Sequence, residues 1–139
     1  MGEIIVKMEL ENYLDRTLFE EKKLEFSDVR KWQMDGLVDT GSTMLMLPQE
    51  VVEILGLRTI RNAIVTYADE RSETRKVAGG LYIKIGERGM NAECMVGQPK
   101  SEALIGQIIM ESLDLIVDPK NRKLSPRPES PIYPSLKAK

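Results

Sequence analysis

The sequence predicts an all-β fold with two short helices. Apolar and polar residues alternate with a period of two along most of the chain, which is typical of half-buried strands. Only two short segments have the pattern of a helix, and the chain contains an internal repeat. With 139 residues, of which 42% are hydrophobic and 30% charged, it has the size and composition of one soluble globular domain.

The first half is expected to contain three strands and one helix. Apolar residues alternate with charged ones over 4–10, which predicts a strand. The charged stretch 12–28 is expected to form a long solvated hairpin. Alternation resumes over 32–38, and a second short apolar strand is expected over 44–47. A short helix over 48–56 follows, because a proline stands at its first position and a glycine at its end.

The second half is expected to contain two hairpins, a helix and a last strand. A strand over 60–67, a polar tip over 68–72 and a return strand form the first hairpin. Alternation over 81–96, interrupted by a turn with two glycines, predicts the second. A short helix over 106–113 then leads into a strand over 115–117.

The end of the chain differs in composition from the rest. Four of the seven prolines lie after Leu124, and proline neither donates to a sheet nor continues a helix. We therefore divide the chain into a folded domain, residues 1–124, and a Pro-rich C-terminal tail, residues 125–139. The tail is expected to be loose or to act as a clamping arm.

The internal repeat relates one stretch of the first half to one of the second. Residues 37–57 align without gaps with residues 95–115, and five of the 21 pairs are identical where roughly one is expected by chance. The identical pairs are Val38/Val96, Gln49/Gln107, Glu53/Glu111, Leu55/Leu113 and Leu57/Leu115. The repeat predicts two copies of one structural unit. Only the first copy has an acid in its loop, because Asp39 is matched by Gly97.

Charge and composition exclude several classes of function. The 20 Lys and Arg residues are balanced by 22 Asp and Glu, so nucleic acids and anionic membranes are not expected partners. The chain has no His, which excludes Ser-His-Asp and Cys-His pairs. The single Cys94 is expected to be a buried structural thiol. No apolar run approaches the ~20 residues of a membrane span and no leader pattern is present, so a cytoplasmic location is expected.

The motif that carries chemistry lies at the end of the strand over 32–38. This strand runs into Asp39–Ser42 (DTGS), a tight turn that places one carboxylate among backbone amides. The DTG tripeptide alone is weak evidence for a functional motif, since a chain of this length contains it by chance with a probability of roughly 2%. A second motif, Ala103–Gly106 (ALIG), stands a helix and two hairpins later. Together the motifs resemble those of the retropepsin-like (retroviral-type) aspartic proteases, including bacterial and archaeal single-domain members.

The resemblance covers about residues 4–124 and implies a closed barrel with a pseudo-two-fold repeat. It implies that Asp39 is the catalytic carboxylate. It also implies that the active-site loop is supported by Thr40, Gly41 and Ser42. The residues expected to pack against that loop are Leu104, Ile105 and Gly106. The Thr of the family ties the two loops of a dimer together, and its Gly lets the substrate backbone approach. Ser42 differs from the Ala usual in retroviral enzymes and looks like the Ser or Thr of the pepsin-like ones.

The resemblance also implies an aspartic endopeptidase that works as a homodimer. Such enzymes need two carboxylates that share one proton, and this chain has one DTG, so the second Asp39 is expected from a symmetry mate. One carboxylate activates a water molecule while the other polarises the scissile carbonyl, with no cofactor and no metal. The substrate is expected to bind as an extended peptide under two flaps, between apolar walls that include Leu45 and Leu47.

The region expected to form the flap departs from the pattern of the family. Its tip and the adjoining strand end, which we assign to the flap and to substrate binding, are Tyr67, Ala68, Asp69 and Glu70, whereas the retroviral tip is Gly-rich. Tyr67 is expected either to face the cleft, as the flap tyrosine of pepsin-like enzymes does, or to be an ordinary strand tyrosine. Retroviral enzymes also bind the substrate backbone with acidic residues that follow their motif. In this sequence Thr43 and Met44 stand at those positions.

Two other interpretations stay open on the sequence alone. The domain could be a retropepsin-like dimerisation or peptide-binding module with little or no turnover, because a fold does not fix a function and a charged flap tip could close poorly. The DTG turn could also belong to an unrelated β domain, although this leaves the internal repeat unexplained.

Overall fold

The computed structural model describes residues 3–138 and consists mainly of strands, which confirms the all-β expectation. In chain order the elements are β1 (Ile5–Asn12), α1 (Tyr13–Glu20), the 3-10 turn η1 (Phe26–Asp28), β2 (Lys31–Val38), β3 (Leu45–Pro48), α2 (Gln49–Ile54), β4 (Arg58–Thr66), β5 (Ser72–Ile85), β6 (Arg88–Gly97), β7 (Leu104–Ile105), α3 (Gln107–Ser112), β8 (Leu115–Asp118) and β9 (Lys123–Pro126). None of the helices within residues 3–138 has the length and apolar character needed to cross a membrane.

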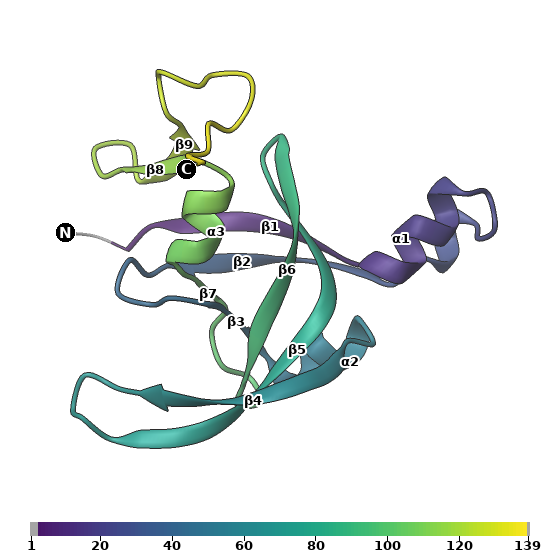
Figure 1. Cartoon of the computed structure of the whole chain (residues 1–139), viewed down its shortest axis with the longest axis horizontal. Helices are drawn as coiled ribbons and strands as arrows, with labels where there is room; N and C mark the ends of the chain where they lie inside the picture. The colour runs from purple at the N-terminus through teal and green to yellow at the C-terminus, as the bar shows by residue number, and fades with distance from the viewer. Residues whose placement is uncertain (1–2, 139) are drawn as a thin grey trace.

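Seven strands form one sheet in the order β1-β2-β7-β3-β6-β5-β4. β1 also pairs with β5, so six of these strands form a ring of pairings and β4 lies outside it as the edge strand. Figure 1 shows β4 and β5 extending from the ring as a long hairpin, with α1 at the opposite side of the molecule. β8 and β9 form a separate two-stranded sheet.

The pairing registers follow the internal repeat of the sequence. Leu37 on β2 pairs in parallel with Leu104 on β7, and their equivalents Met95 on β6 and Met46 on β3 also pair in parallel. Met46 and Leu104, which are equivalent to each other in the repeat, pair antiparallel. Helices α2 and α3 likewise begin and end at equivalent positions of the two copies. A two-fold relation between the halves therefore exchanges β2 with β6 and β3 with β7.

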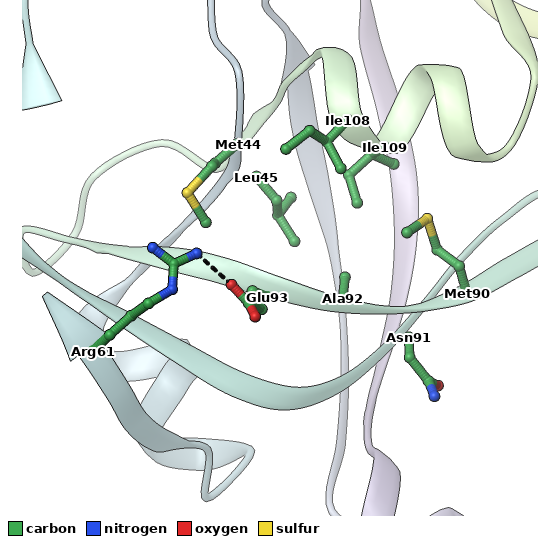
Figure 2. Close-up of a pocket in the computed structure, with 9 residues that line it drawn as sticks. All are labelled: Met44, Leu45, Arg61, Met90, Asn91, Ala92, Glu93, Ile108 and Ile109. Carbon is green, nitrogen blue, oxygen red and sulfur yellow. Dashed lines mark hydrogen bonds and ion pairs between the residues drawn. The ribbon is translucent and has the colours of Figure 1, made fainter. Parts of the chain in front are cut away.

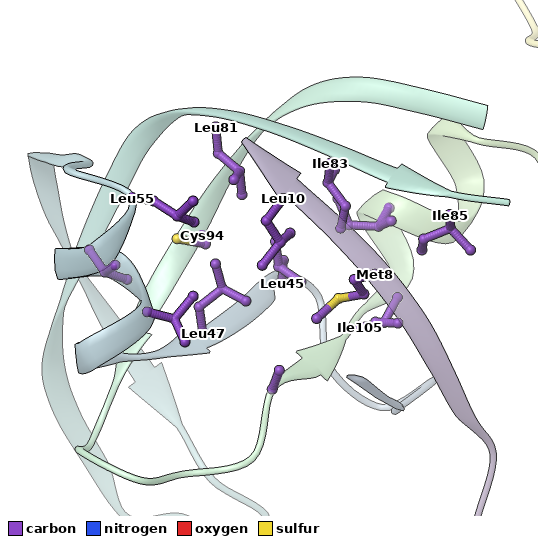
Figure 3. Packing of buried hydrophobic residues seen from close by; sticks show 14 of the residues in the cluster. Met8, Leu10, Leu45, Leu47, Leu55, Leu81, Ile83, Ile85, Cys94 and Ile105 are labelled. Carbon is purple, nitrogen blue, oxygen red and sulfur yellow. The ribbon is translucent and has the colours of Figure 1, made fainter. Parts of the chain in front are cut away.

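The hydrophobic core lies inside the ring and takes side chains from both halves (Figure 3). Met8, Leu10 and Ile83 are 0–1% exposed where β1 meets β5. Leu45 and Leu47, both expected to line the substrate cleft, are 1% and 0% exposed and belong to this core. Cys94 is also fully buried, as expected, and burial raises the pKa of its thiol to about 12.

Helix α1 corrects the expectation of two helices and of a long solvated hairpin over 12–28. Asn12 caps the helix, since its side-chain oxygen accepts a hydrogen bond from the Asp15 backbone N–H at 3.0 Å. The buried Asp15 carboxylate in turn accepts bonds from the backbone N–H and the Nε of Arg30, at 3.0 and 2.8 Å. These bonds from Arg30 lower the pKa of Asp15. The pair of Asp15 with Arg30 thus ties α1 to the residue that precedes β2, and the charges of this segment are not all solvated.

The C-terminal segment is held to the body of the molecule by Asp114, which follows α3. Its carboxylate accepts hydrogen bonds from the Ser130 hydroxyl, the Ser135 backbone N–H at 2.8 Å and the Arg127 Nε. These bonds, that of Ser130 first, lower the pKa of Asp114 to about 2. The buried Arg88 donates to the backbone oxygens of Asp114 and Ser130 from the other side. The tail therefore folds against the domain by polar contacts.

Candidate active site

The DTGS turn holds the Asp39 carboxylate by both of its oxygens. The Gly41 backbone N–H donates to Oδ1 at 3.0 Å, and the Ser42 hydroxyl donates to Oδ2 at 2.8 Å. The turn itself is closed by the Ser42 backbone N–H, which donates to the Asp39 carbonyl at 3.1 Å. Asp39 is half-buried, whereas Thr40 and Gly41 are exposed. The carboxylate is therefore fixed in orientation yet accessible, which a group that handles protons requires.

The sequence motif ALIG supports this loop from the other half of the chain. The Asp39 backbone N–H donates to the Ile105 carbonyl at 3.0 Å, and β7, which is Leu104–Ile105, pairs with the end of β2. At the start of α3 the Gln107 backbone N–H donates to the Ser42 carbonyl at 2.9 Å. The Gln107 side chain also donates to the Thr40 carbonyl at 2.6 Å. The loop and the second motif are thus brought together as the resemblance implied.

Gly106 is required by the close approach of these two segments. A Cβ at this position would lie 2.7 Å from the Met44 carbonyl oxygen and 2.8 Å from that of Ser42. Both atoms belong to the backbone, so neither can move aside without displacing the loop. A side chain at Gly106 would therefore disturb the segment that carries Asp39.

The equivalent segment in the second half, at the end of β6, carries no acid at the position of Asp39. Gly97 stands at the position of Asp39 and is buried. A Cβ there would lie 2.6 Å from the Ser101 hydroxyl oxygen. The Lys100 backbone N–H, which stands at the position equivalent to Ser42, donates to the Glu50 carboxylate at 2.9 Å. The repeat therefore contributes one carboxylate to the site, not two.

These observations agree with a comparison against known families. A family model described as an aspartyl protease matches residues 24–109, which is more than half of the chain and includes both Asp39 and Gly106. The chain belongs to the aspartyl protease family. The match supports the retropepsin-like assignment made from the DTGS and ALIG motifs. No curated protein matches the chain.

In this family member the expected flap is the hairpin of β4 and β5, with its tip at 67–71. Figure 1 shows it on the same side of the molecule as the loop between β2 and β3. The Tyr67 hydroxyl donates to the Glu73 carboxylate, which also accepts from the Arg75 Nε at 2.9 Å. These bonds, that of Tyr67 first, lower the pKa of Glu73. The Arg71 guanidinium lies 4.9 Å from the centre of the Tyr67 ring.

The remaining tip residues make few contacts with the rest of the protein. Ala68, Asp69 and Glu70 are exposed, and Glu70 has a left-handed backbone with φ of 67°. The Asp69 carboxylate accepts the backbone N–H of Arg71 at 3.1 Å, which closes the turn locally. The tip is therefore exposed and is closed by a hydrogen bond between neighbouring residues.

Sequence analysis missed an apolar pocket beside the active-site loop. Its volume is about 270 Å³, and Figure 2 shows its lining residues. They come from β3 and the residue before it, from β4, from β6 and from α3. No local pattern could reveal a pocket whose walls come from four separate parts of the chain.

Proposed function

We propose that this protein is an aspartic endopeptidase whose active site forms across a homodimer. The observation that carries the proposal is a single carboxylate, Asp39, held by two hydrogen-bond donors in an accessible turn. The repeat offers Gly97, not a second acid, at the equivalent position. A second copy of the chain is therefore the source of the other carboxylate.

In the proposed reaction two Asp39 side chains act on one water molecule. Two like charges about 3 Å apart cannot both ionise, so the pair shares one proton. The ionised carboxylate takes a proton from water as the water attacks the peptide carbonyl, and the protonated one donates to the carbonyl oxygen. As the tetrahedral intermediate collapses, the Asp39 that took the proton from water passes it to the leaving amine, and a hydroxyl of the intermediate returns a proton to the other Asp39. No covalent intermediate with the protein is required.

The proposed substrate is an extended peptide that lies between the Asp39 loops and the β4–β5 hairpins. Main-chain pairing with a flap strand would supply binding that is independent of sequence. The proposal treats residues 1–124 as the protease domain, with the ring of strands as its closed barrel, and residues 125–139 as the tail. The family membership supports a peptide substrate.

The test is cleavage of an unfolded protein and a mixed peptide library between pH 3 and 8. Asp39→Asn should lower the rate by roughly a thousandfold, because it removes both proton-transfer roles. Asp35→Asn is the matched control, since Asp35 is an exposed acid on β2, the strand that leads into Asp39. Dilution of the wild-type protein should lower the rate more than linearly if the site forms between two copies. A rate that scales linearly at all concentrations would contradict the dimer.

A second candidate function is a peptide-binding or dimerisation module with little turnover. The observation that favours it is the flap tip, where the Tyr67 hydroxyl is bonded to Glu73 and three charged residues lie at 69–71. If wild type and Asp39→Asn remain folded dimers, bind peptides equally and cut none, this function replaces the first.

A further inference from the structure

One edge of β4 has no partner strand in the part of the chain that the structure describes. β4 pairs with β5 alone, whereas each of the other strands of the large sheet has two or more neighbours. The hairpin of β4 and β5 extends away from the ring (Figure 1). A strand edge that is neither paired nor covered offers its backbone N–H and C=O groups to a further strand.

The second half of β4 lacks the features that usually protect such an edge. Residues 62–66 (NAIVT) contain no charge and no proline, and their last three residues are β-branched. Ile64 is 76% exposed, the largest value for any large hydrophobic residue of the described strands. The irregularity in the pairing with β5 lies between Thr59 and Arg61, before this segment. Residues 62–66 are therefore a regular strand that gains by covering Ile64.

This segment is complementary to a second copy of itself in the antiparallel direction. When a two-fold axis passes through Ile64, apolar residues face apolar ones and polar residues face polar ones. The pairs are Ile64 with Ile64, Ala63 with Val65, and Asn62 with Thr66. An axis at Arg61 would instead bring two guanidinium groups face to face. The sequence of the edge thus favours one symmetric register.

Charges outside the segment agree with this register. In an antiparallel pair, the start of β4 in one copy lies at the same end as the hairpin tip of the other copy. Arg58 at the start and Glu70 in the tip are both exposed, and both stand six residues from Ile64. Neither forms an ion pair with any residue in 3–138. Opposite charges that lack partners in one copy therefore meet between two copies.

We propose that the edge of β4 is an interface between two copies of this chain, in which residues 62–66 pair antiparallel about Ile64. The contact joins the two β4–β5 hairpins into one four-stranded sheet. It is separate from the proposed Asp39 contact and does not rest on it. A chain with two different two-fold contacts forms assemblies larger than a dimer. Because the paired segment is short, the contact is weak and forms at high protein concentration.

The first test measures assembly size by sedimentation velocity at about 1 μM to 1 mM protein. Ile64→Lys should weaken the contact by about a hundredfold, because two like charges face each other and two isoleucines lose their burial. Its largest species should disappear, which leaves dimers if the Asp39 contact forms and monomers if it does not. Ile132→Lys is the matched control, since Ile132 in the tail is 75% exposed. It should keep the wild-type distribution, and both variants should keep the wild-type Tm.

The second test restores the contact with opposite charges. Ile64→Lys and Ile64→Glu should each fail to pair with themselves. An equimolar mixture of the two should recover the larger species, because a lysine then faces a glutamate across the axis. Recovery requires position 64 of one copy to face position 64 of another. An edge that binds a different protein or an unrelated peptide would give no recovery.

The third test determines the register by cross-linking. Directly opposite residues have Cα atoms about 4.5–5.5 Å apart, which is within the range of a disulfide. Ile64→Cys should therefore link two copies under mild oxidation, while Cys94 is fully buried and does not compete. Thr66→Cys is the control on the same strand. In the proposed register the two copies of position 66 lie about 14 Å apart along the strands, too far for a disulfide.

Each outcome decides the proposal. It is supported if Ile64→Lys alone loses the largest species, the mixture recovers it, and position 64 cross-links but position 66 does not. It is overturned if wild type and Ile64→Lys have the same size distribution at every concentration, if the mixture shows no recovery, or if both positions cross-link equally. None of these measurements depends on cleavage, so a failure of the proposed peptidase would leave them unchanged.

Discussion

The loops after β2 and after β6 occupy equivalent places in the two halves, but they differ in their side chains and in their hydrogen bonds. In the first, Asp39 is half-buried and its carboxylate is held by Gly41 and Ser42. In the second, Gly97 is buried, and Lys100 binds Glu50 of α2 through its backbone. One copy of the unit keeps an accessible acid, whereas the other only closes the fold. The difference is the reason why the proposed aspartic dyad takes its second carboxylate from another copy of the chain.

The strongest test of this difference between the two loops is to move the acid from position 39 to position 97. Asp39→Gly combined with Gly97→Asp should leave kcat/KM roughly a thousandfold below wild type. A side chain at Gly97 would start 2.6 Å from the Ser101 hydroxyl and 3.3 Å from the Leu47 carbonyl, so it has no room to reach solvent. Gly97→Asp alone controls for damage to the fold. A relocated acid that restored cleavage would show that the two loops are interchangeable.

A second prediction concerns the support of the Asp39 loop. Gly106→Ala should cost about 1–3 kcal/mol in the free energy of unfolding, because its Cβ would press on backbone atoms at 2.7–2.8 Å. Gly97→Ala should cost less, since its nearest neighbour is a side-chain atom, the Ser101 hydroxyl, and the nearest backbone atom is 3.3 Å away. Urea denaturation of both variants measures the difference. Equal costs would mean that the Gly106 contact relaxes easily.

A third prediction concerns the Ser42 hydroxyl, one of the two donors to the Asp39 carboxylate. Ser42→Ala removes the 2.8 Å bond to the Asp39 Oδ2 and should lower kcat/KM by about tenfold, since a bond to a charged group contributes ~1.5–3 kcal/mol. Lys100→Asn tests the equivalent position of the other loop. Asn tolerates the φ of 64° there, so activity should not change. If both variants lose activity alike, the effect belongs to loop stability.

The smallest expected effect lies at the ends of α2 and α3, where Gly56 and Asp114 are equivalent and both have left-handed φ values, 64° and 54°. The folded pKa of Asp114 is about 2, against an ordinary 3.8, so its carboxylate stabilises the fold above about pH 4. This contribution is lost as pH falls towards 2. Asp114→Asn should lower Tm above pH 4 and flatten the dependence of Tm on pH below that value. Asp35→Asn on β2 should leave both unchanged.

Local patterns predicted the parts of the fold that are determined locally. Period-two alternation located most of the strands, and the repeat placed α2 and α3 at equivalent positions of its two copies. The DTGS turn was visible because its bonds join neighbours in sequence. Leu45 and Leu47 were expected to line the cleft but lie in the core. Which face of β3 points into the ring depends on the strands around it and not on the local pattern.

Helix α1 and the pocket were missed for a different reason. The cap at Asn12 was present in the sequence, but the surrounding charges indicated solvent, and the pair of Asp15 with Arg30 joins two residues on separate elements. The pocket depends on four segments that meet only after folding. Interactions of this kind need the three-dimensional arrangement before they can be recognised.

The pairing of β1 with β5 has a consequence for a protein proposed to cut extended chains. Pairing between Leu10 and Ile83 closes the ring, so among the described strands of the large sheet only β4 lies outside it. A peptidase that binds substrates as strands would also meet its own copies, and strands locked in a ring cannot be drawn into another active site without unfolding. Self-digestion should therefore begin at the exposed flap tip and in the segment after β9, and leave the ring intact.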